Sequence, residues 1–236
     1  MVKIIDLSQE IRHRDKNSQH PAVPMPLIFI SPTFEEAYEE SNGRSSSIDE
    51  WVNMGTHTGT HMDSQRHSDP NPKAITIDQV PLEWCYGDAI CIDLSDKQPK
   101  SWITPEDLDR ACIKGNVRIK KEDILLLYTG HWNRTRGTTA YSTDWVGLNR
   151  EAVEWIKNVG VKLFGIDAPA PDNPIDQAQY MIFLSHDLLR EEGLPHIENL
   201  ANLDKVVNKR FIFIGFPIKV KGASGSWIRA VALLKD

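Results

Sequence analysis

The sequence predicts a single mixed α/β domain with few, short helices. Three observations carry this prediction, and the first two are short apolar runs typical of buried strands and capped amphipathic segments that alternate with them along the chain. The third is the length, because 236 residues fit one compact domain and suffice to bury a core. The chain shows neither an internal repeat nor a low-complexity linker, so we expect one domain over residues 1–236.

The expected strands are short, apolar and bounded by polar or turn residues. The first lies at the start of the chain, where residues 1–8 are too short and too polar after Leu7 to be a signal peptide. The order of the strands in a sheet does not follow from these runs. Further strands are expected at 90–94, 123–128, 163–167 and 211–215.

Helices are predicted where a capping residue precedes an amphipathic segment. Thr104 is a suitable N-cap, because a proline and an acidic first turn follow it. The segment 149–159 has apolar residues at helical spacing, and Gly160 is expected to end that helix. Ser185 is expected to cap a short helix that ends at Gly193.

Composition excludes several classes of function. The net charge of -6 comes without a basic stripe, so we expect no nucleic-acid partner. No apolar run approaches the roughly 20 residues that span a bilayer, so we expect no membrane segment. The cysteines Cys85, Cys91 and Cys112 form no Cys-x-x-Cys pair and are expected to be small hydrophobic residues in a reducing compartment, which predicts a cytoplasmic protein.

The N-terminal region differs from the rest of the chain. Residues 12–26 are polar and include three prolines, and they have little to pack on within one chain. We therefore expect residues 8–45, approximately, to cover the surface or to wrap around a partner subunit. This predicts a homo-oligomer, a dimer or a tetramer.

The most informative segment contains His57, His61, Asp63 and His67. Their spacings are all even, and an extended chain places residues of even spacing on one side. A helix would instead turn Asp63 away from the first two imidazoles. The threonines around Gly59 also favour an extended conformation. Two imidazoles and a carboxylate on one face are common ligands of zinc and other divalent ions.

This stretch resembles the motif of the cyclase-like metal hydrolases, His-x-Gly-Thr-His-x-Asp-x-Pro-x-His. That family includes the bacterial kynurenine formamidases and the isatin hydrolases. Every fixed position matches except the proline, which is Gln65 here. Trp227 also stands where proline is common, and the first fifty residues match only loosely. The other segments that carry the resemblance are 126–132, 165–169, 185–189, 197–200 and 222–229.

The resemblance implies a fold of the swivelling β/β/α type with a central, barrel-like mixed sheet. It also implies a centre for two divalent ions, in which His57 and His61 hold the first ion and Asp63 bridges both. His186 would hold the second ion, and Glu198 would reach the pair. From the residues alone, His186 is a helix N-terminal residue and Glu198 is a solvated charge.

The resemblance further implies that His67 donates and accepts protons during the hydrolysis of an amide-type C–N bond. A divalent ion can activate water and polarise the carbonyl, and an imidazole that titrates near 6.5 suits the proton transfer. No Gly-x-Ser-x-Gly motif indicates a serine nucleophile. The metal is zinc, or manganese as the alternative, since histidine with carboxylate suits zinc and extra carboxylate suits manganese.

The substrate class stays open at this point. The resemblance implies a small molecule: an N-formyl aromatic amine, or a cyclic amide or imide. Kynurenine formamidases typically carry a tryptophan near the N-terminus, and residues 21–31 have none. The alternatives are a lactone or ester hydrolase, a polyketide-type cyclase, and a non-enzymatic metal-dependent binding protein. A proton carrier such as His67 argues against the last of these.

Several other residues are secondary candidates. Asp167 ends an expected buried strand, where it accepts backbone hydrogen bonds or supports the site. Trp132 and His131 line the substrate pocket or pack in the core. Arg229 is expected to form a structural ion pair. Ordinary surface positions are expected for His13, His20 and His196.

Overall fold

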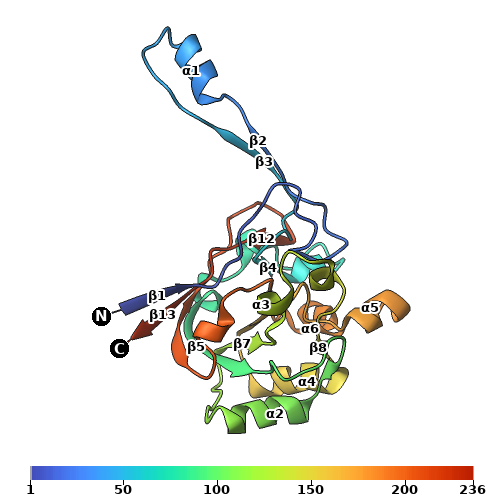
Figure 1. Ribbon diagram of the computed structural model, residues 1–236. Coiled ribbons are helices and arrows are strands. Elements are labelled where there is room, and N and C mark those ends of the chain that lie inside the picture. Colours follow the sequence, from blue (N-terminus) through green and yellow to red (C-terminus); the bar gives the residue numbers. More distant parts are fainter. Residues whose placement is uncertain (1, 236) are drawn as a thin grey trace.

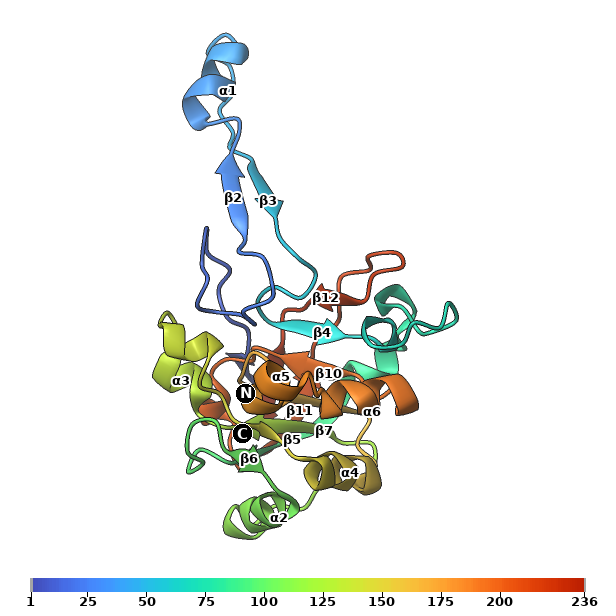
Figure 2. The same ribbon diagram turned by 90° about the vertical axis from the view of Figure 1, so that its right-hand side faces the viewer.

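A nine-stranded mixed sheet forms the centre of the protein and curls strongly into a half-barrel (Figures 1 and 2). The computed structural model describes residues 2–235. The strand order is β1-β13-β11-β5-β7-β9-β10-β4-β12, in which β5, β7, β9 and β10 are parallel and the flanking strands antiparallel. These strands are β1 (Val2–Asp6), β4 (His61–Asp63), β5 (Tyr86–Asp93), β7 (Ile124–Tyr128), β9 (Leu163–Ile166), β10 (His196–Glu198), β11 (Arg210–Ile214), β12 (Gly225–Trp227) and β13 (Val231–Lys235).

Helices connect the parallel strands, because a parallel pair requires a crossover. The crossover from β5 to β7 contains α2, the next contains α3 and α4, and the last contains α5 and α6. A short parallel pair, β6 (Trp102–Ile103) with β8 (Gly147–Leu148), lies beside them. The helices of these crossovers are α2 (Pro105–Lys114), α3 (His131–Thr135), α4 (Arg150–Val159), α5 (Pro174–Tyr180) and α6 (Leu184–Glu192).

The parallel strands are buried on both faces, which explains their continuous apolar sequences. In β7, Leu125 and Leu127 pack in the core that contains the apolar faces of α2 and α4, whereas Ile124 and Leu126 pack in a second core among the other strands. Because successive side chains of a strand point to opposite faces, the residues of β7 contribute alternately to the two cores. The predicted mixed α/β class and the predicted buried strands are confirmed.

Of the predicted helix ends, only the start of α6 is wrong, and its predicted end at Gly193 is confirmed. Asn149 and Gly160 flank α4 as predicted. The N-cap of α6 is Phe183, not Ser185, and Ser185 lies within the first turn. The reason is that the carboxylate of Asp172 accepts the Ser185 N–H at 2.5 Å, so another segment satisfies this end of the helix.

The start of α2 contains a carboxylate that is bound on several sides. Asp107 accepts hydrogen bonds from Lys97 Nζ at 2.6 Å and from the Thr104 N–H at 3.0 Å, and Arg110 adds an ion pair at 2.5 Å. Burial raises the pKa of Asp107, but these partners outweigh it and lower the pKa to about 2. The predicted cap at Thr104 is confirmed as one half of a reciprocal capping box.

Replacing Asp107 by alanine is expected to lower the free energy of unfolding by roughly 1–3 kcal/mol at pH 7, through the lost cap and the lost charged hydrogen bonds. Because the folded pKa is depressed, this contribution is present above the unfolded pKa of about 3.9 and disappears as the pH falls through about 2. Denaturant unfolding at pH 7 and pH 2 tests this. Glu154→Ala, on the exposed face of α4, is the control, and an equal loss in both variants would contradict the prediction.

An arm projects from the body of the protein (Figures 1 and 2). It consists of a two-stranded hairpin, β2 (Leu27–Ile30) and β3 (Glu50–Asn53), with α1 (Phe34–Glu40) at its tip. The arm thus occupies part of the predicted N-terminal region and continues beyond it to residue 53. Its large apolar side chains are more than half exposed: Phe29, Ile30, Phe34, Tyr38, Trp51 and Val52.

Two expectations from composition can be compared with the described residues. No helix within residues 2–235 is both long enough and apolar enough to cross a bilayer. The three cysteines are free; Cys85 and Cys91 are buried and Cys112 is partly buried. Burial raises the pKa of the Cys85 thiol to about 12, so this residue is a packing element, as predicted.

Candidate metal centre

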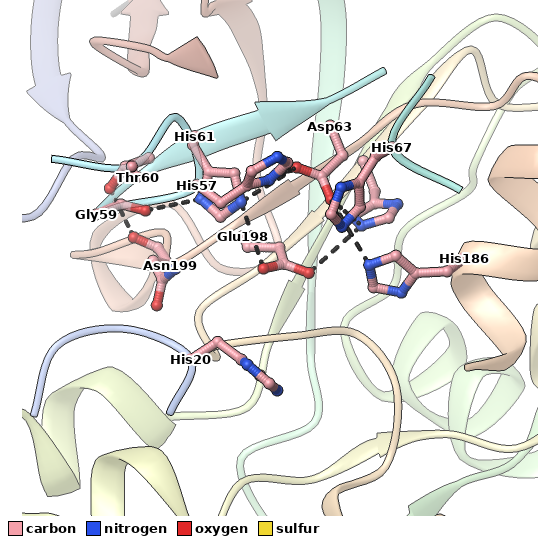
Figure 3. A network of polar contacts seen from close by, with 12 residues as sticks. His20, His57, Gly59, Thr60, His61, Asp63, His67, His186, Glu198 and Asn199 are labelled. Atoms are coloured by element: carbon pink, nitrogen blue, oxygen red, sulfur yellow. Dashed lines mark hydrogen bonds and ion pairs between the residues drawn. The ribbon is translucent and has the colours of Figure 1, made fainter. Parts of the chain in front are cut away.

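The centre is built on the short strand β4, from which His61 and Asp63 point to one face of the sheet (Figure 3). Met62, between them, faces the opposite side and is fully buried in the core. The predicted extended conformation is correct for these residues only. His57 lies in a turn, and His67 ends the 3-10 turn η1 (Gln65–His67), so even spacing alone does not unite the four side chains.

A sharp turn before β4 brings the side chain of His57 back against Asp63 of that strand. Gly59, in the turn, has a φ of +67°, a conformation that favours glycine. The His57 Nδ1–H donates to Asp63 Oδ1 at 2.7 Å, and Ser224 Oγ lies 2.9 Å from Nε2. A Cβ atom at Gly225 would lie 2.5 Å from the His57 ring, so glycine is required there. This contact explains the glycine and serine of the C-terminal segment.

His61 is oriented by its own turn. Its Nδ1–H donates to the Gly59 carbonyl at 2.9 Å, which directs Nε2 toward two carboxylates. Nε2 lies 3.1 Å from Asp63 Oδ1 and 3.5 Å from Glu198 Oε2. Burial lowers the pKa of His61, but Asp63 and Glu198 outweigh it and raise the pKa to about 9. The side chain therefore lies at a point of strongly negative potential, as a cation ligand would.

Strand β10 contributes a second row of side chains opposite β4. In the antiparallel register His196 faces Asp63 and Glu198 faces His61. Both side chains are buried, so the reading of Glu198 as a solvated charge and of His196 as a surface residue is wrong. The neglected signal is the spacing of two, the same as between His61 and Asp63, which puts both on one face of a strand.

Helix α6 contributes His186, whose Nε2 lies 3.6 Å from Asp63 Oδ2. The His186 Nδ1–H donates to Asp172 Oδ2, which fixes the ring and leaves Nε2 directed toward the centre. Asp172 is buried and lies in the loop between β9 and α5. Sequence reasoning missed Asp172, because nothing in its surroundings indicates that it will meet a helix 14 residues later.

The donor atoms of this cluster fit a divalent ion. Two overlapping groups, His57 with His61 and Asp63, and Asp63 with His186, His196 and Glu198, each bring their ligand atoms within 4.8 Å of one another. Among the described residues, His61 Nε2, Asp63 Oδ2 and Glu198 Oε1 are buried without a hydrogen-bond partner. Such atoms are costly to bury unless a ligand satisfies them. Imidazole and carboxylate together are ligands of zinc and manganese. The cluster is therefore a candidate metal site.

His67 lies at the edge of this cluster. Its Nε2 is 3.6 Å from Asp63 Oδ2, and its side chain is one-third exposed. Burial lowers the pKa of His67 to about 4, opposed by Asp63 and reinforced by His57, so the ring is neutral at pH 7. The turn is held by Gln65, whose side chain donates to the Arg190 carbonyl at 3.0 Å. A hydrogen bond from Gln65 to Arg190, which we call the tether, thus holds the turn at the position where the motif has proline.

A cavity of about 450 Å³ opens beside the cluster. Its polar end is formed by ligand residues and His67, and its walls are mainly apolar. Apolar walls come from Ala22, Val23, Pro24, Ala170 and Phe183. His20 lies apart from the ligand side chains (Figure 3) and contacts Gln177 at 2.7 Å on the cavity wall. The expectation that His20 is an ordinary surface residue is therefore wrong.

Hydrogen bonds behind the cluster fix the end of β10. Asn199, directly after Glu198, has a φ of +58°, which ends the strand. Its carbonyl accepts a hydrogen bond from Thr60 Oγ1 at 2.6 Å, and its side chain accepts one from Tyr141 at 2.8 Å. The two strands that carry the ligands are thus joined immediately beside the ligands. This gives a structural role to the threonine and the asparagine of the two motifs.

The remaining candidates lie outside the cluster. Trp132 and His131 are buried in α3 near Tyr141 and do not line the cavity beside the cluster, a position that favours the packing alternative. Asp167 accepts hydrogen bonds from the Thr129 N–H at 2.8 Å and its hydroxyl at 2.6 Å, which confirms that it orients a loop. Arg229 forms the expected ion pair, with Asp6 on the surface. His13 is exposed, as expected.

Replacing Asp172 by asparagine is expected to weaken metal binding by about 10–100-fold without unfolding the protein, because the partner that orients a histidine ligand is lost. Isothermal titration calorimetry with Zn²⁺, together with circular dichroism, measures both effects. Asp176→Asn is the matched control: its carboxylate accepts from Trp102 on the surface of α5. Unchanged affinity in Asp172→Asn would show that this carboxylate does not support the centre.

Known proteins resemble this chain in sequence and in fold. A family model described as "Putative cyclase" matches residues 5–173. Kynurenine formamidase from Geobacillus thermodenitrificans is 32% identical over 76% of this chain and 77% of its own length, and that from Bacillus mycoides is 27% identical over 84% and 86%. The structure of isatin hydrolase A from Labrenzia aggregata, at 23% identity, superposes with a TM-score of 0.84 over all of this chain and 94% of that one. The chain belongs to the cyclase family.

Proposed function

We propose that the protein is a metal-dependent hydrolase that cleaves an amide-type C–N bond in a small aromatic substrate. The observation that carries this proposal is a buried set of imidazole and carboxylate atoms without partners, located at the end of a largely apolar cavity. The relatives named above support it, since the kynurenine formamidases and isatin hydrolase A are named as hydrolytic enzymes.

The ligand residues divide into two groups around Asp63. His57 and His61 would hold one ion together with Asp63, and His186 and Glu198 would hold a second on the other side of the same carboxylate. A bound divalent ion lowers the pKa of water and polarises a carbonyl oxygen. The histidine-rich set suits Zn²⁺, which we propose as the ion, and the two carboxylates make Mn²⁺ the alternative.

His67 performs the proton transfers in this proposal. It is neutral at pH 7, lies at the open edge of the cluster and lines the cavity, so it can take a proton from the attacking water. It would then return that proton to the leaving nitrogen, which needs one when the C–N bond breaks. Asp63, 3.6 Å from the ring, stabilises the imidazolium that exists between the two transfers.

The cavity walls indicate the substrate class. Phe183 and Val23 supply flat and branched apolar surface, which suits an aryl ring. The segment 20–24, which forms part of the wall, belongs to the N-terminal region that lacks the tryptophan typical of kynurenine formamidases. We therefore propose a cyclic aryl amide or imide, of the kind that isatin represents, ahead of an open-chain aryl formamide.

A substrate panel tests this function directly. Protein loaded with Zn²⁺ or Mn²⁺ is assayed with isatin, an N-formyl aryl amine, an aryl lactone and an aryl ester. Hydrolysis of the cyclic amide above the others supports the proposal. Faster turnover of the lactone or ester would assign the esterase alternative. Binding of the aryl ligands without turnover, with either metal, would assign a binding protein and overturn the hydrolase.

We also propose that the arm packs on a second copy of this chain. A two-stranded hairpin is marginally stable by itself, and an exposed apolar patch of this kind marks an interaction surface. Phe29 and Trp51 face each other across the hairpin and are 53% and 70% exposed. Burying such residues in a partner removes apolar surface from water on both sides.

The double variant Phe29→Glu/Trp51→Glu is expected to shift the protein from a dimer or tetramer to a monomer, because two buried charges without partners would oppose association. Light scattering across micromolar concentrations measures the mass. Ser47→Glu adds a charge at an exposed position on the same arm and is expected to leave the mass unchanged. A monomeric mass for the unmodified protein would refute the proposed assembly.

A further inference from the structure

His196 is a buried imidazole whose nitrogens have no protein partner. Its side chain is fully buried, and among residues 2–235 neither Nδ1 nor Nε2 makes a hydrogen bond. A buried polar atom without a partner loses its hydration and gains no hydrogen bond in return. Phe164 packs against the ring, with centroids 5.5 Å apart, and supplies no acceptor or donor. The two ring nitrogens of His196 are therefore without a partner in the described chain, and a bound ligand could provide one.

The surroundings of Nε2 specify what that partner is. Asp63 Oδ2 and Glu198 Oε1 each lie 3.4 Å from it, too far for good hydrogen bonds, and both oxygens lack hydrogen-bond partners in the described chain. His186 Nε2 lies 3.6 Å from the same Asp63 oxygen. A tetrahedral ion with ligand distances of about 2.0–2.2 Å separates its ligand atoms by about 3.3–3.6 Å. These three separations match the edges of such a tetrahedron.

We propose that His196 is a direct metal ligand and that it closes a four-ligand position formed with Asp63, His186 and Glu198. This inference rests on the metal-dependent function proposed above and adds to it a difference between two ion positions. The position of His57, His61 and Asp63 has three protein ligands and leaves a place for water. The position that contains His196 is filled by the protein and has no such place.

A difference in ligand number assigns different tasks to the two positions. Four-ligand sites filled by protein hold an ion for structure, whereas three-ligand sites leave an open place for catalysis. An ion in the closed position would be held by residues of β4, α6 and β10, and Asp63 would belong to both positions. Water activation is therefore assigned to the ion of His57 and His61, because the centroid of the His67 ring lies 4.1 Å from that of His57 and 5.2 Å from that of His186.

The alternative is that His196 is a packed histidine that merely fills space. A packed neutral imidazole normally donates or accepts at least one hydrogen bond, as His131 does with the Tyr141 carbonyl at 2.8 Å. His196 does neither, although two carboxylates face it. His131 is also buried, so it provides a matched control for a histidine of the packed kind.

The test compares metal binding in the full-length protein and the variants His196→Leu, His196→Gln and His131→Leu. Each is stripped with a chelator and titrated with Co²⁺, and the stoichiometry, the dissociation constants and the visible absorption are recorded. We expect two ions per chain for the unmodified protein, with the intense absorption of four-coordinate Co²⁺. Both His196 variants should weaken one ion by at least tenfold and lose part of that absorption. His131→Leu should lower the thermal stability but keep both ions.

Two other results have distinct meanings. Either His196 variant, if it binds the same number of ions with unchanged affinity and spectrum, would overturn this inference and leave the proposed hydrolase intact. Failure of the unmodified protein to bind Co²⁺, Zn²⁺ or Mn²⁺ would instead overturn the metal-dependent function on which the inference rests. Unfolding is monitored by circular dichroism, and the glutamine variant covers the case in which leucine prevents folding.

Discussion

Replacing His61 by alanine is expected to remove the ion of the open position, formed by His57, His61 and Asp63, and nearly all hydrolysis. The imidazole lies between two carboxylates, Asp63 at 3.1 Å and Glu198 at 3.5 Å, and its Nε2 has no other partner in the described chain. Removing it takes one of three protein ligands from the open position. It also leaves the negative charge of both carboxylates less well compensated.

Elemental analysis of the variant after gel filtration measures the metal, and a hydrolysis assay on the same preparation measures the rate. His13→Ala removes an exposed histidine that belongs to neither ligand group, and it is expected to keep both properties. Circular dichroism shows whether the fold is retained. Two bound ions per chain in a folded His61→Ala protein would show that His61 is not a metal ligand.

His67→Ala is expected to keep the metal and to lower turnover by about 10²–10⁴-fold, the typical contribution of general acid–base catalysis. The ring is held outside the ligand groups, with its Nε2 3.6 Å from Asp63 and a third of its side chain exposed. Its removal therefore leaves the ligand atoms of both ions in place. A metal ligand would behave otherwise, since occupancy would fall first and the rate as a consequence.

Metal content and rate are measured together on one preparation, because only their combination separates the two roles. Full occupancy with a slow rate supports the proton carrier. A lower metal content would show that His67 is a metal ligand. Full metal content with an unchanged rate would show that His67 does not carry protons in the reaction. Gln65→Pro restores the residue of the family motif and tests whether the tether to Arg190 matters for the position of the ring.

The parts of this structure that the sequence predicted are those that local chemistry determines. Thr104 and Asn149 cap their helices because their side chains reach amides a few residues away. The strand β7 is recognisable because five consecutive apolar residues allow burial on both faces. His57, His61 and Asp63 are likewise neighbours in the chain, so their motif carries most of the information.

The parts that were missed depend on segments far apart. His196 is buried only because β10 pairs with β4 in a register that sets it against Asp63, and no local pattern specifies that register. Asp172 orients His186 because a loop meets the start of α6. The extended reading of 57–67 was only partly correct for a related reason: Gly59 and the turn at Gln65 bend the chain twice, and both bends are stabilised by partners from the C-terminal quarter.

The position of β4 in the sheet has a consequence for the biosynthesis of the protein. β4 pairs with β10 on one side and β12 on the other, so both of its neighbours belong to the last quarter of the chain. Chains emerge from the ribosome N-terminus first, and such long-range pairing is slow to form. The nascent chain therefore carries His57, His61 and Asp63 long before these strands exist. We therefore expect metal loading to follow translation, because these three residues are synthesised before the strands that flank β4.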